Sequence, residues 1–170
     1  RLRIISKFKS SGRALEIGSS TGFFIALLEE KGWEVLGIEP SGLSYKTATE
    51  KGIPTLNTTF EMSQLPKESF DLVIFNHVLE HMEDPNAVIK KANNVLKKEG
   101  IIFINVPNFG GISAKVRGPL WKYVLPEEHK WHFTRDSLSR LLKKGGFNTI
   151  YFETHSGIWE YGNPYEELWD

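Results

Sequence analysis

A turn of small residues between Gly18 and Gly22 follows the first apolar stretch of the chain and opens directly into a helical pattern. Small residues there let a ligand approach the backbone, and unpaired N–H groups at a helix start favour a carboxylate or a phosphate. The spacing is Gly-x-x-x-Gly, which meets neither the dinucleotide pattern Gly-x-Gly-x-x-Gly nor the Gly-Lys-Ser/Thr ending of a P-loop. Glu39 ends the next apolar stretch, where a carboxylate commonly accepts hydrogen bonds from two ribose hydroxyls. These features together indicate a ligand-binding loop with a ribose-binding acid.

Polar side chains in two further places could position a ligand or move a proton. Asn76 and His77 come directly after a buried apolar stretch, and ligands of open α/β sheets bind beyond the carboxyl ends of the strands. His77 is the first candidate for positioning an acceptor or removing a proton, because imidazole titrates near neutral pH. His129 and His132 are further catalytic candidates, which share with His77 the alternative of a purely structural hydrogen-bonding role.

The segment 107–133, which contains these two histidines, has no clear periodicity and is long for a plain connection. Such loops are usually functional. Its aromatic residues are clustered, at Trp121, Tyr123, Trp131 and Phe133. We expect this segment to form a lid over an apolar or ring-bearing acceptor, with a flap that only covers the core as the alternative.

The residues His77-Val-Leu-Glu80-His81 formally match His-x-x-Glu-His, a pattern of zinc peptidases. That function requires both histidines inside one helix, whereas His77 comes directly off a buried strand and Pro85 follows soon after. It also leaves the glycine loop and Glu39 unexplained. We therefore predict no metal site, interpret Glu80 and His81 as fixing this segment against the sheet, and keep the zinc peptidase as an alternative. An NAD-dependent oxidoreductase and a non-catalytic domain that retains the fold are two others.

Strand and helix patterns alternate along the chain. Strands are predicted at residues 13–18, 33–38, 53–56, 70–75, 101–106 and 147–152, and helices at 21–31, 43–51, 85–98 and 137–144. Asp84 is expected to cap the third helix, with Pro85 at its first position. This alternation predicts an α/β fold, a doubly wound Rossmann-like and mostly parallel sheet with helices on both faces.

The composition limits the other possibilities. The 170 residues suit a single domain over 1–170, and the balance of 21 Lys and Arg against 21 Asp and Glu gives no attraction toward nucleic acid. There is no cysteine for a disulfide or a thiolate, and no apolar run approaches the roughly 18 residues of a membrane span. We expect a cytoplasmic domain and, because the chain starts at Arg1, one trimmed from a longer protein.

Several segments carry a family resemblance when they are taken in order. They are LEIGSSTG (15–22), GIEPS (37–41), FDLVIFNHVLEHMEDP (70–85), an acid-glycine strand start at Glu99-Gly100, VPN (106–108) and HKWHFTRDSLSRLLKKGGF (129–147). In this order and spacing they resemble the class I S-adenosylmethionine-dependent methyltransferases, especially the small-molecule type 11/23-like group similar to ubiquinone-biosynthesis methyltransferases. The resemblance covers roughly residues 13–153.

The resemblance implies roles for the residues of the first loop. In that family the loop carries an acidic residue followed by x-Gly-x-Gly-x-Gly. Glu16, Gly18 and Gly22 match this pattern. Ser20 stands where the middle glycine is usual, and its small hydroxyl is suited to donate to the methionine carboxylate.

The resemblance also implies the rest of the cofactor pocket. Glu39 corresponds to the ribose acid, and Asn76 borders the place of the methyl group. Thr59 occupies the usual aspartate position of the adenine pocket, and Phe60 would flank the base. The implied function is methyl transfer from S-adenosylmethionine, with S-adenosylhomocysteine as product, to an oxygen, nitrogen or carbon atom of a small-molecule acceptor. The implied strand order is 3-2-1-4-5, followed by an antiparallel seventh strand beside the sixth.

Overall fold

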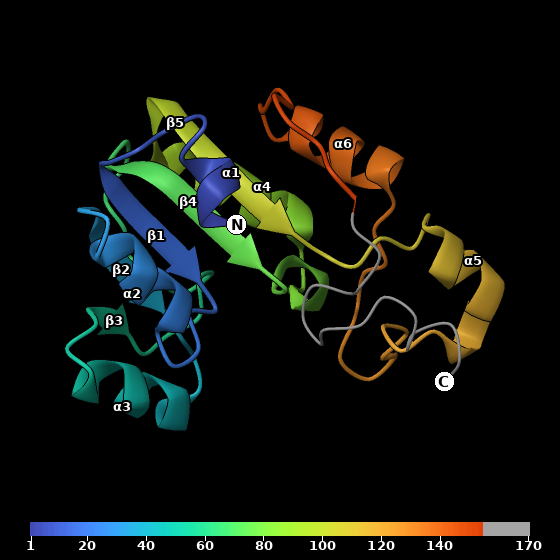
Figure 1. Ribbon diagram of the computed structural model, residues 1–170, viewed down its shortest axis with the longest axis horizontal. Helices are drawn as coiled ribbons and strands as arrows, with labels where there is room; N and C mark the ends of the chain where they lie inside the picture. Colours follow the sequence, from blue (N-terminus) through green and yellow to red (C-terminus); the bar gives the residue numbers. More distant parts are fainter. Residues whose placement is uncertain (155–170) are drawn as a thin grey trace.

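The computed structural model describes residues 1–154 and contains one sheet of five parallel strands in the order β3-β2-β1-β4-β5 (Figure 1). The strands are β1 (Arg13–Ile17), β2 (Glu34–Ile38), β3 (Thr55–Leu56), β4 (Phe70–Asn76) and β5 (Leu96–Asn105). The predicted class and the predicted order of these five strands are confirmed. All five carboxyl ends therefore lie along one edge, at which the loops that follow β1, β2 and β4 meet.

Helices cover both faces of the sheet, as the alternation of patterns predicts. One face carries α1 (Leu2–Ile5), α2 (Phe23–Glu29) and α3 (Gly42–Glu50), of which α1 and α2 lie in front of the sheet in Figure 1. The other face carries α4 (Pro85–Val95) and α6 (Arg135–Lys144). Shorter elements occupy the connections, namely the 3-10 turns η1 (Leu79–His81) and η2 (Gly118–Leu120) and the helix α5 (Ile112–Arg117).

The position of β4 within the sheet explains why its sequence is continuously apolar rather than alternating. Leu72 and Ile74 belong to the core under α1 and α2, whereas Val73 and Phe75 belong to the core under α4. All four side chains are 0% exposed. A strand that is covered on both faces needs apolar residues at every position.

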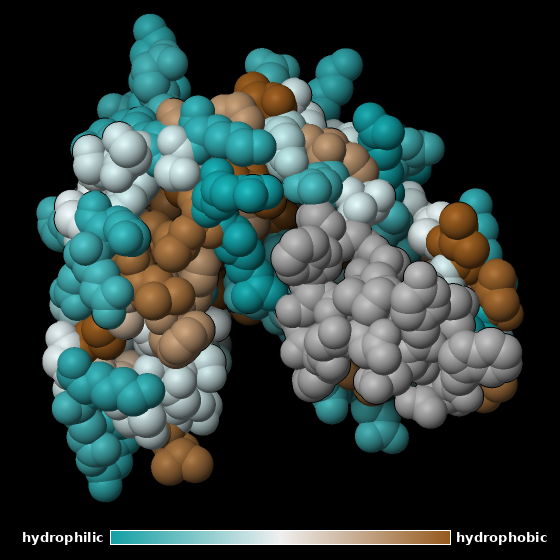
Figure 2. Space-filling model, viewed as in Figure 1, coloured by the Kyte–Doolittle hydropathy of each residue, from teal (hydrophilic) through white to brown (hydrophobic). Residues whose placement is uncertain are grey.

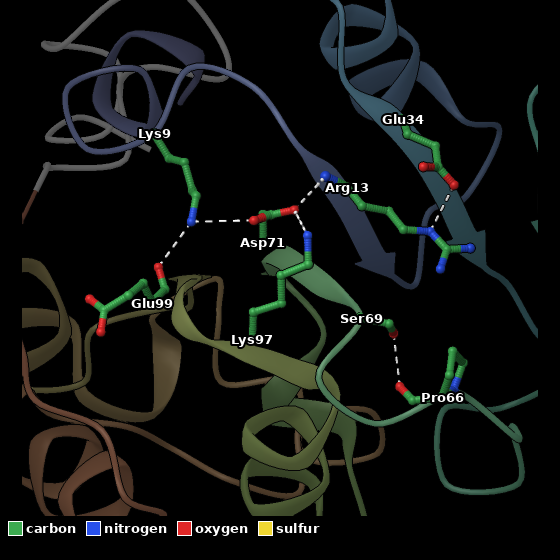
Figure 3. A network of polar contacts seen from close by, with 8 residues as sticks. All are labelled: Lys9, Arg13, Glu34, Pro66, Ser69, Asp71, Lys97 and Glu99. Carbon is green, nitrogen blue, oxygen red and sulfur yellow. Dashed lines mark hydrogen bonds and ion pairs between the residues drawn. The ribbon is translucent and has the colours of Figure 1, made fainter.

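A polar network ties the amino ends of the strands together, at the edge opposite the loops after β1 and β4 (Figure 3). The carboxylate of Asp71 accepts hydrogen bonds from the Arg13 backbone N–H at 2.9 Å and from Lys97 Nζ at 2.7 Å. Lys9 Nζ lies 3.4 Å from the same carboxylate and donates to the Glu99 carbonyl. Partial burial tends to raise the pKa of Asp71, but these donors outweigh it and lower that pKa. The network anchors the amino-terminal segment to β4 and β5.

The boundary between α4 and β5 corrects one prediction. Asp84 caps α4 as expected, since its Oδ1 accepts hydrogen bonds from the N–H groups two and three residues later, at 2.9 and 3.2 Å. The helix, however, ends at Val95 rather than at residue 98, and Leu96 already pairs with Phe70 of β4. The pairing then shifts register before it continues at Ile101, so the polar residues 97–100 form an irregular start to β5.

The predicted sixth strand at 147–152 is wrong, because this segment forms no strand. Its aromatic side chains contact residues outside the sheet. The Tyr151 ring lies 5.8 Å from that of Phe8, and the Arg135 guanidinium lies 4.7 Å from the centre of the Phe152 ring. The expected seventh strand falls beyond residue 154, outside the described residues. Among residues 1–154, no helix has both the length and the apolar character that crossing a membrane requires.

Candidate active site

The loop between β1 and α2 takes the backbone conformation that its small residues suggest. Gly18, Ser20 and Gly22 have φ angles of 65°, 50° and 76°, in the left-handed region that glycine adopts most easily. The N–H groups of Gly18 and Ser19 both donate to the Ile38 carbonyl at the end of β2, at 2.8 and 3.1 Å. The loop is therefore fixed to the carboxyl end of the neighbouring strand. Its left-handed backbone at Ser20 also explains why glycine is usual there in the family.

Glu39 lies against this loop and is fixed at both carboxylate oxygens. Oε2 accepts a hydrogen bond from the Ser20 N–H and Oε1 one from the Ser41 N–H, both at 2.8 Å. Each carboxylate oxygen can accept more than one hydrogen bond, so the fixed carboxylate still has acceptor capacity for the hydroxyls of a ligand. The structure thus brings Glu39 together with the glycine loop, and its contact with a ribose remains a prediction.

The acid that precedes the loop is buried. Glu16 is 3% exposed, and burial raises the pKa of its carboxyl group to about 8. Two buried oxygens at this place, Glu16 Oε2 and Ser19 Oγ, have no hydrogen-bond partner among the described residues. Unpaired buried polar atoms are rare in proteins and need an explanation. A loop that receives the polar end of a ligand provides one, so these residues fit a cofactor of the expected kind.

The segment expected to bind adenine is held from behind by a lysine that sequence reasoning missed. Lys91 Nζ, on α4, donates to the backbone carbonyls of Phe60 at 2.6 Å and of Ser63 at 2.7 Å. The Phe60 ring is 1% exposed and packs edge-on against Phe75, so it belongs to the core. Thr59 beside it is exposed. The roles of Thr59 and Phe60 toward the base remain predictions. The role of Lys91 could have been suspected from the sequence, because a lysine on the buried side of α4 needs a hydrogen-bond acceptor.

Asn76 and His77 lie directly beside the glycine loop, because β1 and β4 are neighbours that pair Ile17 with Phe75. Asn105, at the end of β5, holds both residues. Its Nδ2 lies 3.1 Å from Asn76 Oδ1 and 3.1 Å from His77 Nε2. His77 itself has a φ of 55°, a strained value for a residue with a side chain. Sequence reasoning missed Asn105. A polar residue at the end of an apolar strand could have indicated that it belongs to the site.

The segment 107–133 folds back onto the end of β4, as a lid would. Trp131 donates from its backbone N–H to the Glu80 carbonyl at 3.0 Å, and from Nε1 to the Met82 carbonyl at 2.9 Å. Asn108 and Phe133 form an isolated parallel bridge that closes the base of the segment. The segment is therefore attached at η1, next to His77.

Aromatic rings of this segment form a partly exposed cluster. The Phe109 ring lies 4.0 Å from His132 and 5.0 Å from Trp121, which in turn lies 5.1 Å from Tyr123. Burial, together with the neighbouring His129, lowers the pKa of His132. Apolar side chains also face outward at the far end of the segment, which appears brown in Figure 2: Ile112, Val116 and Leu120 are between 79% and 87% exposed. The catalytic roles of His129 and His132 remain predictions.

This architecture defines a class. A parallel sheet of order 3-2-1-4-5, a glycine loop after β1 and an acid after β2 are the features of class I S-adenosylmethionine-dependent methyltransferases. Residues 1–151 match the family model of a methyltransferase domain, and the chain belongs to this methyltransferase domain family. S-adenosylmethionine is accordingly its cofactor.

Individual relatives agree with this assignment. An uncharacterized protein of Methanocaldococcus jannaschii is 36% identical over 95 residues, which cover 56% of this chain and 44% of that protein. A ubiquinone biosynthesis O-methyltransferase of Bradyrhizobium sp. (strain ORS 278) is 28% identical, over 92% of this chain and 64% of that enzyme. A Thermotoga maritima structure described as a possible histamine N-methyltransferase is 26% identical, with a TM-score of 0.73 over 87% of this chain and 69% of that one. The chain thus spans about half to two thirds of the length of these curated relatives.

Proposed function

We propose that the protein transfers the methyl group of S-adenosylmethionine to an oxygen, nitrogen or carbon atom of a small-molecule acceptor. The observation that carries this proposal is the Glu39 carboxylate, bound to the N–H of Ser20 in the glycine loop and 7% exposed. This arrangement joins the position of a ribose acid to the loop that would receive the methionine end. The cytoplasmic location expected from composition remains a prediction, as does a single domain over 1–170.

The cofactor supplies an activated sulfonium methyl group when it is bound. The chain therefore has mainly to align the acceptor with that group and to exclude water. Asn76 and His77 border this place from β4, and Asn105 holds both side chains in position. Asn105 Nδ2 can only donate, so His77 Nε2 accepts and the ring proton lies on Nδ1 in the neutral form. To remove a proton from a hydroxyl or ammonium acceptor, His77 Nε2 would have to give up its hydrogen bond from Asn105 and accept one from the acceptor instead.

The acceptor would enter between the end of β4 and the segment 107–133. The aromatic cluster of Phe109, Trp121, Tyr123 and His132 supports an apolar or ring-bearing molecule. The relatives named above include an O-methyltransferase and a possible N-methyltransferase, which supports a hydroxyl or an amine acceptor. Neither the fold nor the relatives support the zinc peptidase: His77 lies in the turn after β4, whereas His81 ends a separate 3-10 turn.

Calorimetric titration with S-adenosylhomocysteine tests the proposed ribose contact. Glu39→Gln is expected to weaken binding about 10- to 100-fold, because hydrogen bonds to a charged acceptor contribute about 1.5–3 kcal/mol. Glu30→Gln, an exposed carboxylate on the far end of α2, is the matched control and should bind like the parent protein. No heat at millimolar ligand with the parent protein would overturn the proposal, and equal affinity in Glu39→Gln would reject the ribose role.

His77→Ala tests the proton-transfer role. We expect methyl transfer to fall about 100-fold, the usual contribution of a general base, while S-adenosylhomocysteine affinity changes less than about twofold. The measurement uses radiolabelled S-adenosylmethionine with catechol as a hydroxyl probe and histamine as an amine probe. A rate equal to that of the parent protein would make His77 a structural residue.

A further inference from the structure

Glu80 is a buried carboxylate whose hydrogen-bonding capacity the described residues leave unfilled. It is 1% exposed, and neither of its carboxylate oxygens has a hydrogen-bond partner among the described residues. His77 Nδ1 lies 3.5 Å from Oε1, an ion pair only if that imidazole is protonated. Charged groups that are buried in proteins are paired or coordinate a metal. Beyond that long contact, no described residue satisfies the two buried oxygens of Glu80, so they have acceptor capacity for a bound cation.

Two histidines face this carboxylate from different parts of the chain. His81 follows Glu80 in η1, and His129 lies in the segment 107–133 that folds back onto η1. Their rings are 4.7 Å apart, and His129 is 7% exposed. One ligand atom from each of Glu80, His81 and His129 can be chosen so that all three lie within 4.8 Å of one another.

The hydrogen bonds of the two histidines select one nitrogen on each ring. His81 Nδ1 lies 2.8 Å from the Glu128 carbonyl, and His129 Nδ1 lies 2.9 Å from the Tyr123 carbonyl. A carbonyl oxygen only accepts hydrogen bonds, so both Nδ1 atoms carry a proton, and in the neutral form of each ring Nε2 keeps a lone pair. Histidines that bind metals are held in this way, with the second ring nitrogen donating to a backbone carbonyl or a carboxylate.

We propose that Glu80, His81 and His129 bind one divalent transition-metal ion of the Zn²⁺ type. Two imidazole nitrogens and one carboxylate oxygen suit Zn²⁺ and similar ions, whereas Mg²⁺ and Ca²⁺ prefer oxygen ligands. Bonds of about 2.0–2.2 Å to a tetrahedral ion bring the ligand atoms to about 3.4 Å from one another. From separations of up to 4.8 Å, the ligand atoms therefore approach one another by at most about 1.4 Å. Three protein ligands leave the fourth position to water or to an acceptor atom.

The position of the site gives the ion its role. Glu80 and His81 lie in η1, in the connection after β4, whereas His129 belongs to the segment 107–133, so the ion fastens that segment to the active-site edge of the sheet. The backbone hydrogen bond from Trp131 to the Glu80 carbonyl already joins the same two elements. This metal site does not depend on the proposed methyl transfer. Its second histidine ligand is His129, whereas a zinc peptidase of the His-x-x-Glu-His type would bind the metal through His77.

The test measures metal binding directly, on untagged protein stripped with EDTA. Titration with Zn²⁺ is expected to show one site per chain that also raises the melting temperature, and Mg²⁺ should bind at least 100-fold more weakly. His129→Ala and Glu80→Gln should each weaken Zn²⁺ binding at least 100-fold, whereas Glu83→Gln, which alters an exposed carboxylate nearby, should bind like the parent protein. Circular dichroism confirms that each variant is folded.

Three outcomes would overturn the proposal: no Zn²⁺ binding, equal binding in the ligand variants and the parent, or equal affinity for Mg²⁺. If Glu80→Gln misfolds, His81→Ala replaces it, because His81 is only partly buried. Titration of S-adenosylhomocysteine into the same stripped protein keeps the two proposals separate, because the glycine loop and Glu39 contribute no metal ligand.

Discussion

Gly18→Ala is expected to weaken binding of S-adenosylhomocysteine at least 10-fold and to destabilise the fold. Gly18 has a φ of 65°, and a Cβ atom added there would lie 2.5 Å from Val78 Cγ2. The left-handed backbone alone costs about 1–2 kcal/mol for an alanine. The clash pushes the glycine loop away from the turn that follows β4, which is the junction between the two halves of the proposed cofactor site.

Two further variants separate the clash from the backbone strain. Gly32→Ala places the same strain at a φ of 85°, where an added Cβ meets nothing within 4 Å. It should therefore lose about 1–2 kcal/mol of stability and keep full affinity for S-adenosylhomocysteine. Val78→Ala in the Gly18→Ala background removes the clashing atom and should recover part of the affinity. Calorimetry and urea unfolding measure both quantities, and full affinity in folded Gly18→Ala would contradict the expected loop displacement.

Glu16→Gln is expected to remove a large pH dependence of stability. Burial raises the pKa of Glu16 to about 8 in the folded protein, from an ordinary value of 4.5 for an exposed glutamate. Between these two values the folded state holds a proton that the unfolded state has released, so the free energy of unfolding falls as pH rises. The favourable contribution is complete below about pH 4.5 and is lost by about pH 8, and at about 1.4 kcal/mol per pH unit it amounts to as much as about 5 kcal/mol.

Glutamine keeps the shape of the protonated acid and does not ionise. Glu16→Gln should therefore be more stable than the parent by a few kcal/mol at pH 8, and nearly equal to it at pH 5. Urea unfolding across this range, on protein free of ligand, measures the difference. Glu30→Gln, with its exposed side chain, should follow the pH profile of the parent protein. The same profile in Glu16→Gln would mean that the carboxyl group ionises without cost in the folded state.

The sheet was predictable because its signals are local. The apolar run at 70–75 requires a strand that is covered on both faces, and Asp84 followed by Pro85 marks a helix start whatever the rest of the chain does. The proposed cofactor site was predictable for the same reason, since a turn with left-handed residues needs glycine at Gly18 and Gly22. Glu39 follows the neighbouring strand, so parallel pairing of β1 with β2 brings it to that loop.

Predictions failed where a distant partner decides the conformation. Residues 96–99 are compatible with a helix, and it is the pairing of Leu96 with Phe70 that makes them the start of β5. Residues 147–152 have the composition of a strand, but Tyr151 and Phe152 pack on Phe8 and Arg135 instead of joining the sheet. Strand propensity describes how a side chain fits a pleated surface, and it cannot say whether an edge is available.

The histidines show the same division most clearly. The sequence by itself determined the class of fold, the glycine loop and its acid, because those follow from periodicity, backbone conformation and the parallel pairing of adjacent strands. It gave no reason to pair His81 with His129, which lie 48 positions apart. Only the tertiary structure decided that His81, His129 and the buried Glu80 come together, because that depends on how the aperiodic segment 107–133 folds back onto the end of β4.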